Sequence, residues 1–238
     1  MLLHITNERA MFEDEHKYLI ISDLHLGIEK SLEGKGFRIP DQYGFLLDSI
    51  LKLKNITDAE GIIILGDVKH DIGLPFEIKK FQNFFKTLSN ELKIIIVKGN
   101  HDGGIENLID AEIHSPRGIL KWGIYFSHGH TWPSQSLNRA EYLLMGHIHP
   151  EIRILDEKTK KMYNSCWLKT HPGKNFKKHY PDFSGEIIIF PAFNPLVGMA
   201  IMDVIPGPLF NNGLINIKNL DVYLLDSTYL GKFGKIKK

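Results

Sequence analysis

The chain has 238 residues, of which 43% are hydrophobic, and its formal net charge at pH 7 is +1. This balance excludes a strong global attraction to nucleic acid or to an anionic membrane, so recognition of a charged substrate must be local. The first residues lack a secretory pattern, and no apolar run approaches the roughly 18 residues that a membrane span needs. We expect a cytoplasmic protein with one domain over residues 1–238 and no membrane partner.

Strands and helices alternate over the first hundred residues. The apolar runs at 17–22, 61–65 and 93–97 predict three short buried strands. Residues 41–54 repeat apolar side chains at helical spacing behind an aspartate that can cap a helix, and residues 75–90 carry a second apolar stripe. Strands joined by helical crossovers pair in parallel, so this half predicts an α/β sheet.

Each of the three strands runs into polar residues flanked by glycine. The motifs are DLH after the first strand, GDVKHD after the second and GNHD after the third. The carboxyl ends of neighbouring parallel strands meet at one edge of an open α/β sheet, where ligands bind. We therefore expect the three motifs to gather at one rim.

The second half of the chain predicts another sheet. The segments GIYFSHGH, EYLLMGHIHP, EIRILD, MYNSCWLKTH and GEIIIFPAF are strand-like, with little helical periodicity between them. This pattern favours a more antiparallel sheet packed on the first. Within it, His147 and His149 are two residues apart, so an extended backbone would point both imidazoles to the same side. Such a pair suits a metal ion, although partly exposed polar side chains at a strand end give the same pattern.

The polar residues at these strand ends form a set rich in oxygen and imidazole donors. The set contains no thiolate, and the single cysteine, Cys166, lacks a CxxC partner. Such donors suit Mn²⁺ first, with Fe, Zn²⁺ or Ni²⁺ as alternatives, and they outnumber the ligands of one tetrahedral site. Two divalent ions about 3.5–4 Å apart fit the number of donors better. In chain order, the set is Asp23, His25, Asp67, Asn100, His101, His128, His147 and His149.

Five motifs in this order resemble the calcineurin-like metallophosphoesterases: DLH, GDVKHD, GNHD, HGH and GHIH. The resemblance implies an α/β fold, a four-layer αββα sandwich of two mixed β-sheets flanked by helices. It also implies a dinuclear metal-dependent phosphoesterase in which a metal-bridging hydroxide attacks phosphorus. The metal ligands implied are Asp23, His25 and His149 for one ion, Asn100, His128 and His147 for the other, and Asp67 bridging both.

The resemblance also implies roles around the metals. His101 would be the catalytic residue that contacts the substrate phosphate and assists the leaving oxygen. Spacing alone does not decide between His128 and His130 as the ligand in HGH, and the resemblance favours His128. His130 is then expected beside the ligands.

One motif departs from the common family pattern. In GDVKHD, the placement of His70 resembles the GDLFH of the family's DNA double-strand-break repair nucleases, which implies contact with nucleic acid; a structural hydrogen bond is the alternative. Asp71 could orient His101 by fixing its tautomer. Lys30 and Arg38, in the loop IEKSLEGKGFRIP, are candidate phosphate contacts or solvated loop charges.

A narrower resemblance covers most of the chain. The stretch DLHLGIEKSLEGKGFRIP, with HGHTWP, GHIHP and PAFNPLVG, is similar to the Icc-like branch, which includes archaeal proteins and bacterial phosphoesterases associated with a DNA ligase and a helicase. The branch implies possible DNA-repair partners but names no substrate, and the sequence leaves the oligomeric state open. Residues 158–180 interleave lysines with aromatic side chains, which could guide a single strand of nucleic acid, although we favour a hairpin with a lysine-rich turn.

The function expected is hydrolysis of nucleic-acid or nucleotide phosphodiesters, with DNA or RNA as candidate polymers. One alternative is a cyclic-nucleotide phosphodiesterase or a small-molecule phosphomonoesterase, which a deep narrow pocket would favour. An open groove lined by residues 158–180 would favour a polymer. A non-catalytic metal-binding scaffold is the third hypothesis, and retention of every expected ligand together with His101 argues against it.

Overall fold

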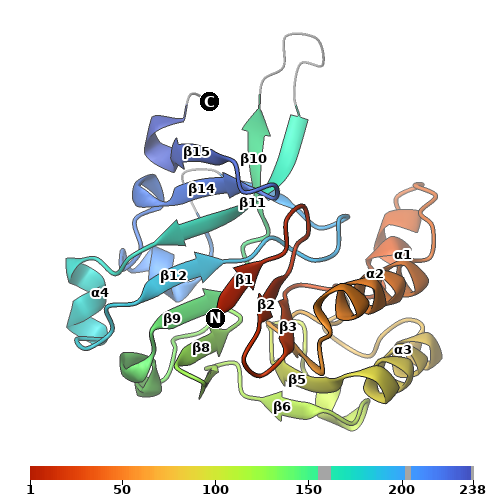
Figure 1. The fold of residues 1–238 in the computed structure, drawn as a ribbon. Coiled ribbons are helices and arrows are strands. Elements are labelled where there is room, and N and C mark those ends of the chain that lie inside the picture. The colour runs from red at the N-terminus through yellow and green to blue at the C-terminus, as the bar shows by residue number, and fades with distance from the viewer. Residues whose placement is uncertain (155–161, 202–204, 237–238) are drawn as a thin grey trace.

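The computed structural model describes residues 1–154, 162–201 and 205–236, and it contains two β-sheets (Figure 1). The first sheet has the order β1-β2-β3-β4-β5-β6. Strands β3 to β6 pair in parallel, and β1 and β2 add an antiparallel edge. The strands are β1 (Leu2–His4), β2 (Met11–Glu13), β3 (Tyr18–Ile21), β4 (Gly61–Ile64), β5 (Lys93–Val97) and β6 (Glu112–His114).

The second sheet has the order β13-β10-β11-β12-β9-β8-β7, with β14 and β15 continuing from β11. It is mixed, because β8, β9 and β12 pair in parallel whereas β10, β11, β12 and β14 pair antiparallel. The strands are β7 (Ile119–Lys121), β8 (Ile124–Ser127), β9 (Tyr142–Met145), β10 (Pro150–Ile154), β11 (Met162–Thr170), β12 (Glu186–Ile189), β13 (Met199–Ala200), β14 (Asp221–Leu224) and β15 (Tyr229–Lys232).

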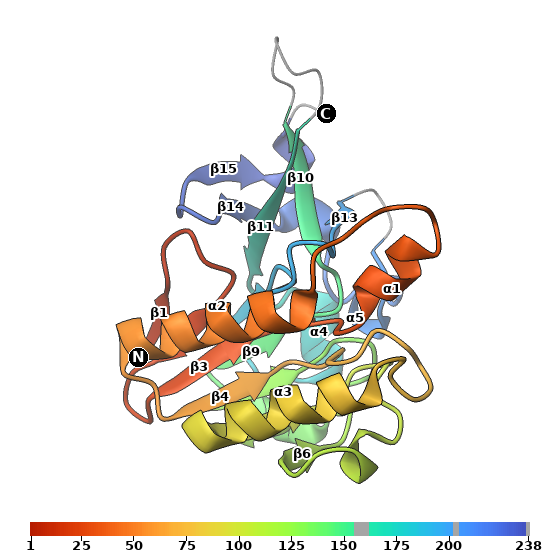
Figure 2. The ribbon, with the colours of Figure 1, turned by 90° about the vertical axis from the view of Figure 1, so that its right-hand side faces the viewer.

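Helices cover the outer faces of the two sheets. In Figure 2, α2 and α3 lie in front of β3 and β4, and their buried side chains join the core beneath them. Shorter helices pack on the second sheet through Phe176 and Leu209. The helices are α1 (Ile28–Glu33), α2 (Gln42–Thr57), α3 (Ile78–Glu91), α4 (Lys174–His179) and α5 (Pro208–Asn211).

Apolar side chains between the sheets hold the two layers together. Ile20, Ile63 and Ile95 of the first sheet share a fully buried cluster with Leu144 and Ile188 of the second. Alternation along each strand sends neighbouring side chains to the outer cores instead, so both faces of both sheets are buried. This arrangement confirms the predicted four-layer αββα fold.

Most predicted elements of the first half are confirmed, with shifts at their ends. Asp41 caps α2 by accepting a hydrogen bond from the amide of Gly44 at 3.3 Å. The second helix begins at Ile78, later than the pattern indicated. Phe45 is exposed although it shares the helical spacing of the buried residues of α2. The short helix α1 lies in a segment that the sequence indicated as a loop.

The lysine-rich segment 158–180 contains the predicted hairpin strand. Strands β10 and β11 pair antiparallel, with Glu151 opposite Ser165, and residues 155–161, where the lysine-rich turn is expected, lie outside the described residues. The segment's aromatic side chains are mostly structural, because Trp167, Phe176 and Tyr180 are buried in the cores. Tyr163 is exposed.

Cys166 lies on β11 with its side chain buried. Within the described parts of the chain, no helix is long and apolar enough to cross a membrane.

Candidate metal centre

The predicted donors lie in the loops that follow five strands, at the rim where the two sheets meet. β3, β4 and β5 contribute from the first sheet, and β8 and β9 from the second. The structure therefore confirms the expected gathering of the three early motifs and adds the two histidine motifs to it. The loops carry Asp23 and His25 after β3, Asp67 after β4, Asn100 and His101 after β5, His128 after β8, and His147 and His149 after β9.

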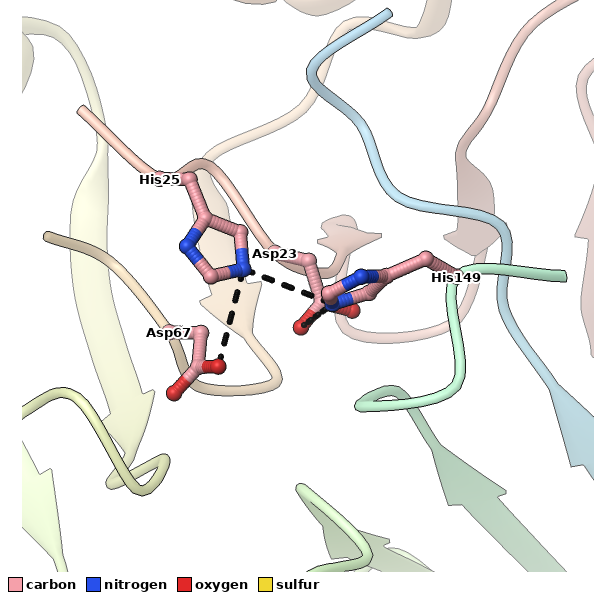
Figure 3. Close-up of side chains that lie close together, drawn as sticks. All are labelled: Asp23, His25, Asp67 and His149. Atoms are coloured by element: carbon pink, nitrogen blue, oxygen red, sulfur yellow. Dashed lines mark hydrogen bonds and ion pairs between the residues drawn. The ribbon is translucent and has the colours of Figure 1, made fainter. Parts of the chain in front are cut away.

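One group of donors consists of Asp23, His25, Asp67 and His149, whose side chains converge in Figure 3. The Nε2 atom of His149 lies 3.0 Å from Oδ1 of Asp23. The Nε2 atom of His25 lies 3.4 Å from Nε2 of His149 and 3.5 Å from Oδ2 of Asp67. The four side chains could hold one metal ion.

A second group shares Asp67 and adds His128 and His147. The Nε2 atom of His128 lies 3.4 Å from Oδ2 of Asp67 and 3.2 Å from Oδ1 of Asn100. The amide oxygen of Asn100 therefore faces the same space as the histidines. Because Asp67 belongs to both groups, its carboxylate stands where a bridging ligand would be required.

The carboxylates of this cluster are buried without an ordinary counterion. Asp23 is 0% exposed and Asp67 is 1% exposed. Among the described residues, only histidines lie within ion-pair distance of either carboxylate. Burial raises the pKa of Asp67, but His128 and the backbone amide of His101 outweigh burial and lower the pKa well below its usual range. The charged carboxylate is thus the favoured form.

The surroundings of the cluster shift the pKa values of its histidines in opposite directions. Burial lowers the pKa of His128, but contacts with Asp67 and Asp23 overcome burial and raise it to about 9. Burial lowers the pKa of His25 and of His147 to about 4. Neutral imidazoles of this kind keep a lone pair for a metal ion at neutral pH.

The chemistry of the donor set fits divalent cations. Two imidazole nitrogens 3.4 Å apart, beside two buried carboxylates, concentrate electron pairs in one place. A divalent cation would satisfy these groups, because nitrogen and oxygen donors without a thiolate suit such ions.

The backbone around the donors is strained. Asp23, His25, Asp67, His147 and His149 all have φ between 41° and 72°, in the left-handed region. This region costs a residue other than glycine about 1–2 kcal/mol. Strain of this kind collects at functional sites, where the surrounding structure enforces it. The donors themselves make sharp turns, as do two neighbouring glycines, Gly66 with φ of 73° and Gly129 with φ of 109°.

Two further glycines, Gly99 and Gly146, permit close contact with the candidate ligands. A Cβ atom on Gly99 would lie 2.2 Å from the amide nitrogen and Oδ1 of Asp67. A Cβ atom on Gly146 would lie 1.8 Å from Oγ of Ser22 and 2.6 Å from Oδ2 of Asp23. Any side chain at these positions would displace a candidate ligand.

His101 stands at the open side of the cluster, with 24% of its side chain exposed. Its backbone amide donates to Oδ1 of Asp67 at 2.9 Å, and its Nε2 lies 3.9 Å from Oδ2 of the same carboxylate. Its Nδ1 contacts the carbonyl oxygen of His70. That carbonyl stands in the place expected for Asp71, whose carboxylate instead accepts a hydrogen bond from the amide of Phe76 at 3.3 Å.

The other predicted residues lie at different distances from the donors. The ring of His130 lies 5.1 Å from that of His128 and belongs to neither donor group, so His128 is the better placed of the two. The ring of His70 lies 5.6 Å from that of His25. Arg38 is exposed and makes no hydrogen bond or ion pair with a described residue, whereas Lys30 pairs with Glu33 at 2.9 Å.

Sequence reasoning missed Lys69, a fully buried lysine inside GDVKHD. Its ammonium group donates hydrogen bonds to the carbonyl oxygens of Asp71, Ile72 and Gly73, at 2.8–2.9 Å, and also to that of His101. One cation thus joins the loop after β4 to the loop after β5. The motif alone gave no sign of this role, because a lysine between polar residues looks solvated.

Asp102 joins the same two loops by a different route. It is fully buried, and its carboxylate accepts hydrogen bonds from the amides of Gly99 at 2.8 Å and Val68 at 2.9 Å. On the other side of the cluster, the side-chain amide of Asn194 donates to the carbonyl of Leu24 at 2.8 Å. These buried polar contacts fix the loops that carry the donors.

Replacing Lys69 with Met should loosen the loop after β4. Four carbonyl oxygens would lose their donor, so the free energy of unfolding should fall by roughly 1–3 kcal/mol. Amide hydrogen exchange at residues 71–76 should become faster. Lys79→Met, an exposed change on α3, should stay within about 0.5 kcal/mol of the wild type. Equal stability and exchange in the two variants would contradict the role of Lys69.

Comparison with known proteins identifies the family to which the chain belongs. The profile of the calcineurin-like phosphoesterases matches residues 16–197. No curated protein gives a significant sequence match. Among solved structures, the chain is similar to the nuclease MPE of Pseudomonas putida, with a TM-score of 0.59 and 18% identity over 95% of this chain and 96% of that one.

Two further solved structures are similar at lower scores. One is Yfce, a phosphoesterase from E. coli, with a TM-score of 0.41 and 18% identity over 90% of this chain and 97% of that one. The other is a conserved uncharacterized protein of Streptococcus pneumoniae, a predicted phosphoesterase, with a TM-score of 0.31 and 13% identity over 93% of this chain and 94% of that one.

The likeness to the Pseudomonas structure agrees with the fold described above. The family binds divalent metal ions, and the two donor groups offer the histidines and aspartates that such ions require. Because the family profile covers more than half of the chain, we conclude that this protein belongs to the calcineurin-like phosphoesterases and is a hydrolase acting on phosphoester bonds.

Proposed function

We propose that the protein is a dinuclear, metal-dependent phosphodiesterase acting on nucleic-acid or nucleotide phosphodiesters, with Mn²⁺ as the first candidate metal. The observation that carries the proposal is the carboxylate of Asp67, which belongs to both donor groups. We assign Asp23, His25 and His149 to one ion, and Asn100, His128 and His147 to the other.

When bound, two divalent cations at these positions would activate water at neutral pH and neutralise the charge of a phosphate. The residues of this chain orient the reaction. Asp67 accepts a hydrogen bond from the backbone amide of His101 at 2.9 Å. This bond fixes the catalytic histidine relative to the proposed bridging carboxylate. The deeply buried Asp23, Asp67 and His128 keep bulk water away from one side, whereas the partly exposed His101 faces the side from which a substrate would arrive.

His101 is suited to protonate a leaving oxygen. The carbonyl of His70 contacts Nδ1 and favours a proton on that atom. The Nε2 atom then faces the cluster, 3.9 Å from Oδ2 of Asp67, and is the nitrogen that would pass a proton to the leaving oxygen. Transfer of that proton would convert the departing alkoxide of a phosphodiester into an alcohol.

The charges around the site favour a diester over a monoester. A phosphodiester carries one negative charge, whereas a phosphomonoester carries close to two at neutral pH. Among the described residues, no lysine or arginine forms an ion pair with the clustered carboxylates. The nuclease among the similar structures is consistent with the same substrate class. Repair partners and cytoplasmic location stay predictions.

Hydrolysis of a set of phosphoesters tests the proposed reaction. Bis-p-nitrophenyl phosphate, cyclic nucleotides and labelled single- and double-stranded DNA and RNA should be compared with p-nitrophenyl phosphate, each with Mn²⁺ and with chelator. Diesters should be cleaved in the presence of Mn²⁺, and chelator should stop the reaction. Preferred cleavage of p-nitrophenyl phosphate would indicate a phosphomonoesterase, and no cleavage with any divalent metal would indicate a scaffold.

Asp67→Asn tests the bridging assignment. Loss of the shared charge should weaken the binding of both ions and reduce hydrolysis to the background rate. Metal content after equilibrium dialysis should fall from two ions per wild-type chain, and circular dichroism should show that the variant is folded. The matched control is Asp48→Asn, an exposed change on α2. If Asp67→Asn kept near-normal turnover, Asp67 would not be the bridge.

His101→Ala tests the separation of catalysis from metal binding. The variant should retain both ions, because His101 is not among the proposed ligands. The kcat value should fall by about 10²–10⁴-fold, the usual contribution of a general acid. His171→Ala, at an exposed histidine, serves as the control. Loss of metal from His101→Ala would mean that its role is ligation.

A further inference from the structure

Three large apolar side chains protrude from the loop between β4 and α3. Ile72 is 72% exposed, Leu74 is 70% exposed and Phe76 is 77% exposed. Single exposed apolar residues are common on protein surfaces, but three within five residues form a patch that calls for an interaction. We refer to Ile72, Leu74 and Phe76 as the apolar ledge.

The backbone beneath the apolar ledge is held firmly. The ammonium group of Lys69 binds the carbonyl oxygens of Ile72 and Gly73, and the carboxylate of Asp71 binds the amide of Phe76. Pro75, between the exposed side chains, is buried. The loop is therefore a fixed support that presents apolar groups to solvent.

The apolar ledge adjoins the candidate metal centre. It follows His70, whose ring lies 5.9 Å from that of His101 at an interplanar angle of 22°. Lys69 contacts both the ledge backbone and the carbonyl of His101, so one anchor sets both positions. Figure 2 shows the loop between β4 and α3 at the same end of the molecule as α1.

The segment after α1 supplies positive charge next to this loop. The stretch from β3 to α2 borders this loop at both ends, because the amide of His70 donates to the carbonyl of Leu26 at 3.0 Å and Lys80, near the start of α3, pairs with Asp41 at 3.5 Å. Lys35 and Arg38 are exposed, and neither forms an ion pair with a described residue. Phe37, between them, is 60% exposed. Two cations that form no ion pair with a described residue thus flank one exposed aromatic ring in this segment.

We propose that the apolar ledge contacts the bases of a single-stranded polynucleotide whose phosphates meet Lys35 and Arg38. The inference rests on the proposed phosphodiesterase function and specifies its substrate. Grooves that bind single strands combine cations for the backbone with aromatic faces for the bases. Bases of an intact duplex are stacked on one another, and a small diester has no neighbouring nucleotide to reach the ledge.

Phe76→Ala tests the contact through substrate preference. The kcat/KM for a single-stranded oligonucleotide, divided by that for bis-p-nitrophenyl phosphate, should fall about tenfold, mainly through KM, as expected for one lost stacking contact. Ile56→Ala, at an exposed apolar residue near the far end of α2, should leave the ratio unchanged. An unchanged ratio in Phe76→Ala, or an equal loss on both substrates, would overturn the inference.

Phe76→Trp gives a direct signal that does not depend on hydrolysis. With chelator present, a single-stranded oligonucleotide should quench the added tryptophan fluorescence, measured against the wild-type background. An abasic strand of the same length has the same charge without bases and should not quench it. Equal quenching by both strands, or by neither, would refute base contact.

The two assays separate this inference from the proposed function. A wild-type protein that cleaves no diester contradicts the function, whereas cleavage of diesters with no effect at Phe76 contradicts only the ledge. Light scattering tests whether a second copy of the chain, rather than a polynucleotide, covers the apolar ledge. A wild-type dimer that Phe76→Ala converts into a monomer would assign the ledge to self-association and overturn the inference.

Discussion

Burial of two carboxylates at the junction of the sheets is the constraint on which this site depends. Asp23 and Asp67 are almost completely inaccessible, and moving a charge out of water is costly unless other groups compensate. Histidines and the backbone amides of His101 and His147 supply part of that compensation. Bound divalent cations would supply the rest, and the shared position of Asp67 would let one carboxylate serve two of them.

The sandwich makes this arrangement possible because it brings strand ends from both sheets to one rim. The apolar layer between the sheets fixes β4 against β9, so loops distant in sequence can hold donors in strained conformations. Buried connectors then set the loops against each other. Lys69 and Asp102 tie the loop after β4 to the loop after β5, and Asn194 supports the loop that carries Asp23.

The place of the candidate donors was predictable because their motifs follow apolar runs, and the carboxyl ends of parallel strands meet at one edge of a sheet. The short helix α1 and the exposure of Phe45 were not, because each depends on what packs against the segment in three dimensions. The burial of Lys69 was hidden for a related reason, since carbonyl oxygens from two separate loops enclose its ammonium group. The aromatic residues Trp167 and Phe176 matched a pattern typical of single-strand nucleic-acid binding, but both side chains are buried in the hydrophobic core.

The proposed site holds two ions that share Asp67. Anomalous diffraction from crystals grown with Mn²⁺ tests it most directly, because each bound ion gives its own peak. A shared Asp67 predicts two peaks about 3.5–4 Å apart, one beside His25 and His149, the other beside His128 and His147, with the Asp67 carboxylate between them. A single peak, or two peaks that Asp67 does not contact, would contradict it.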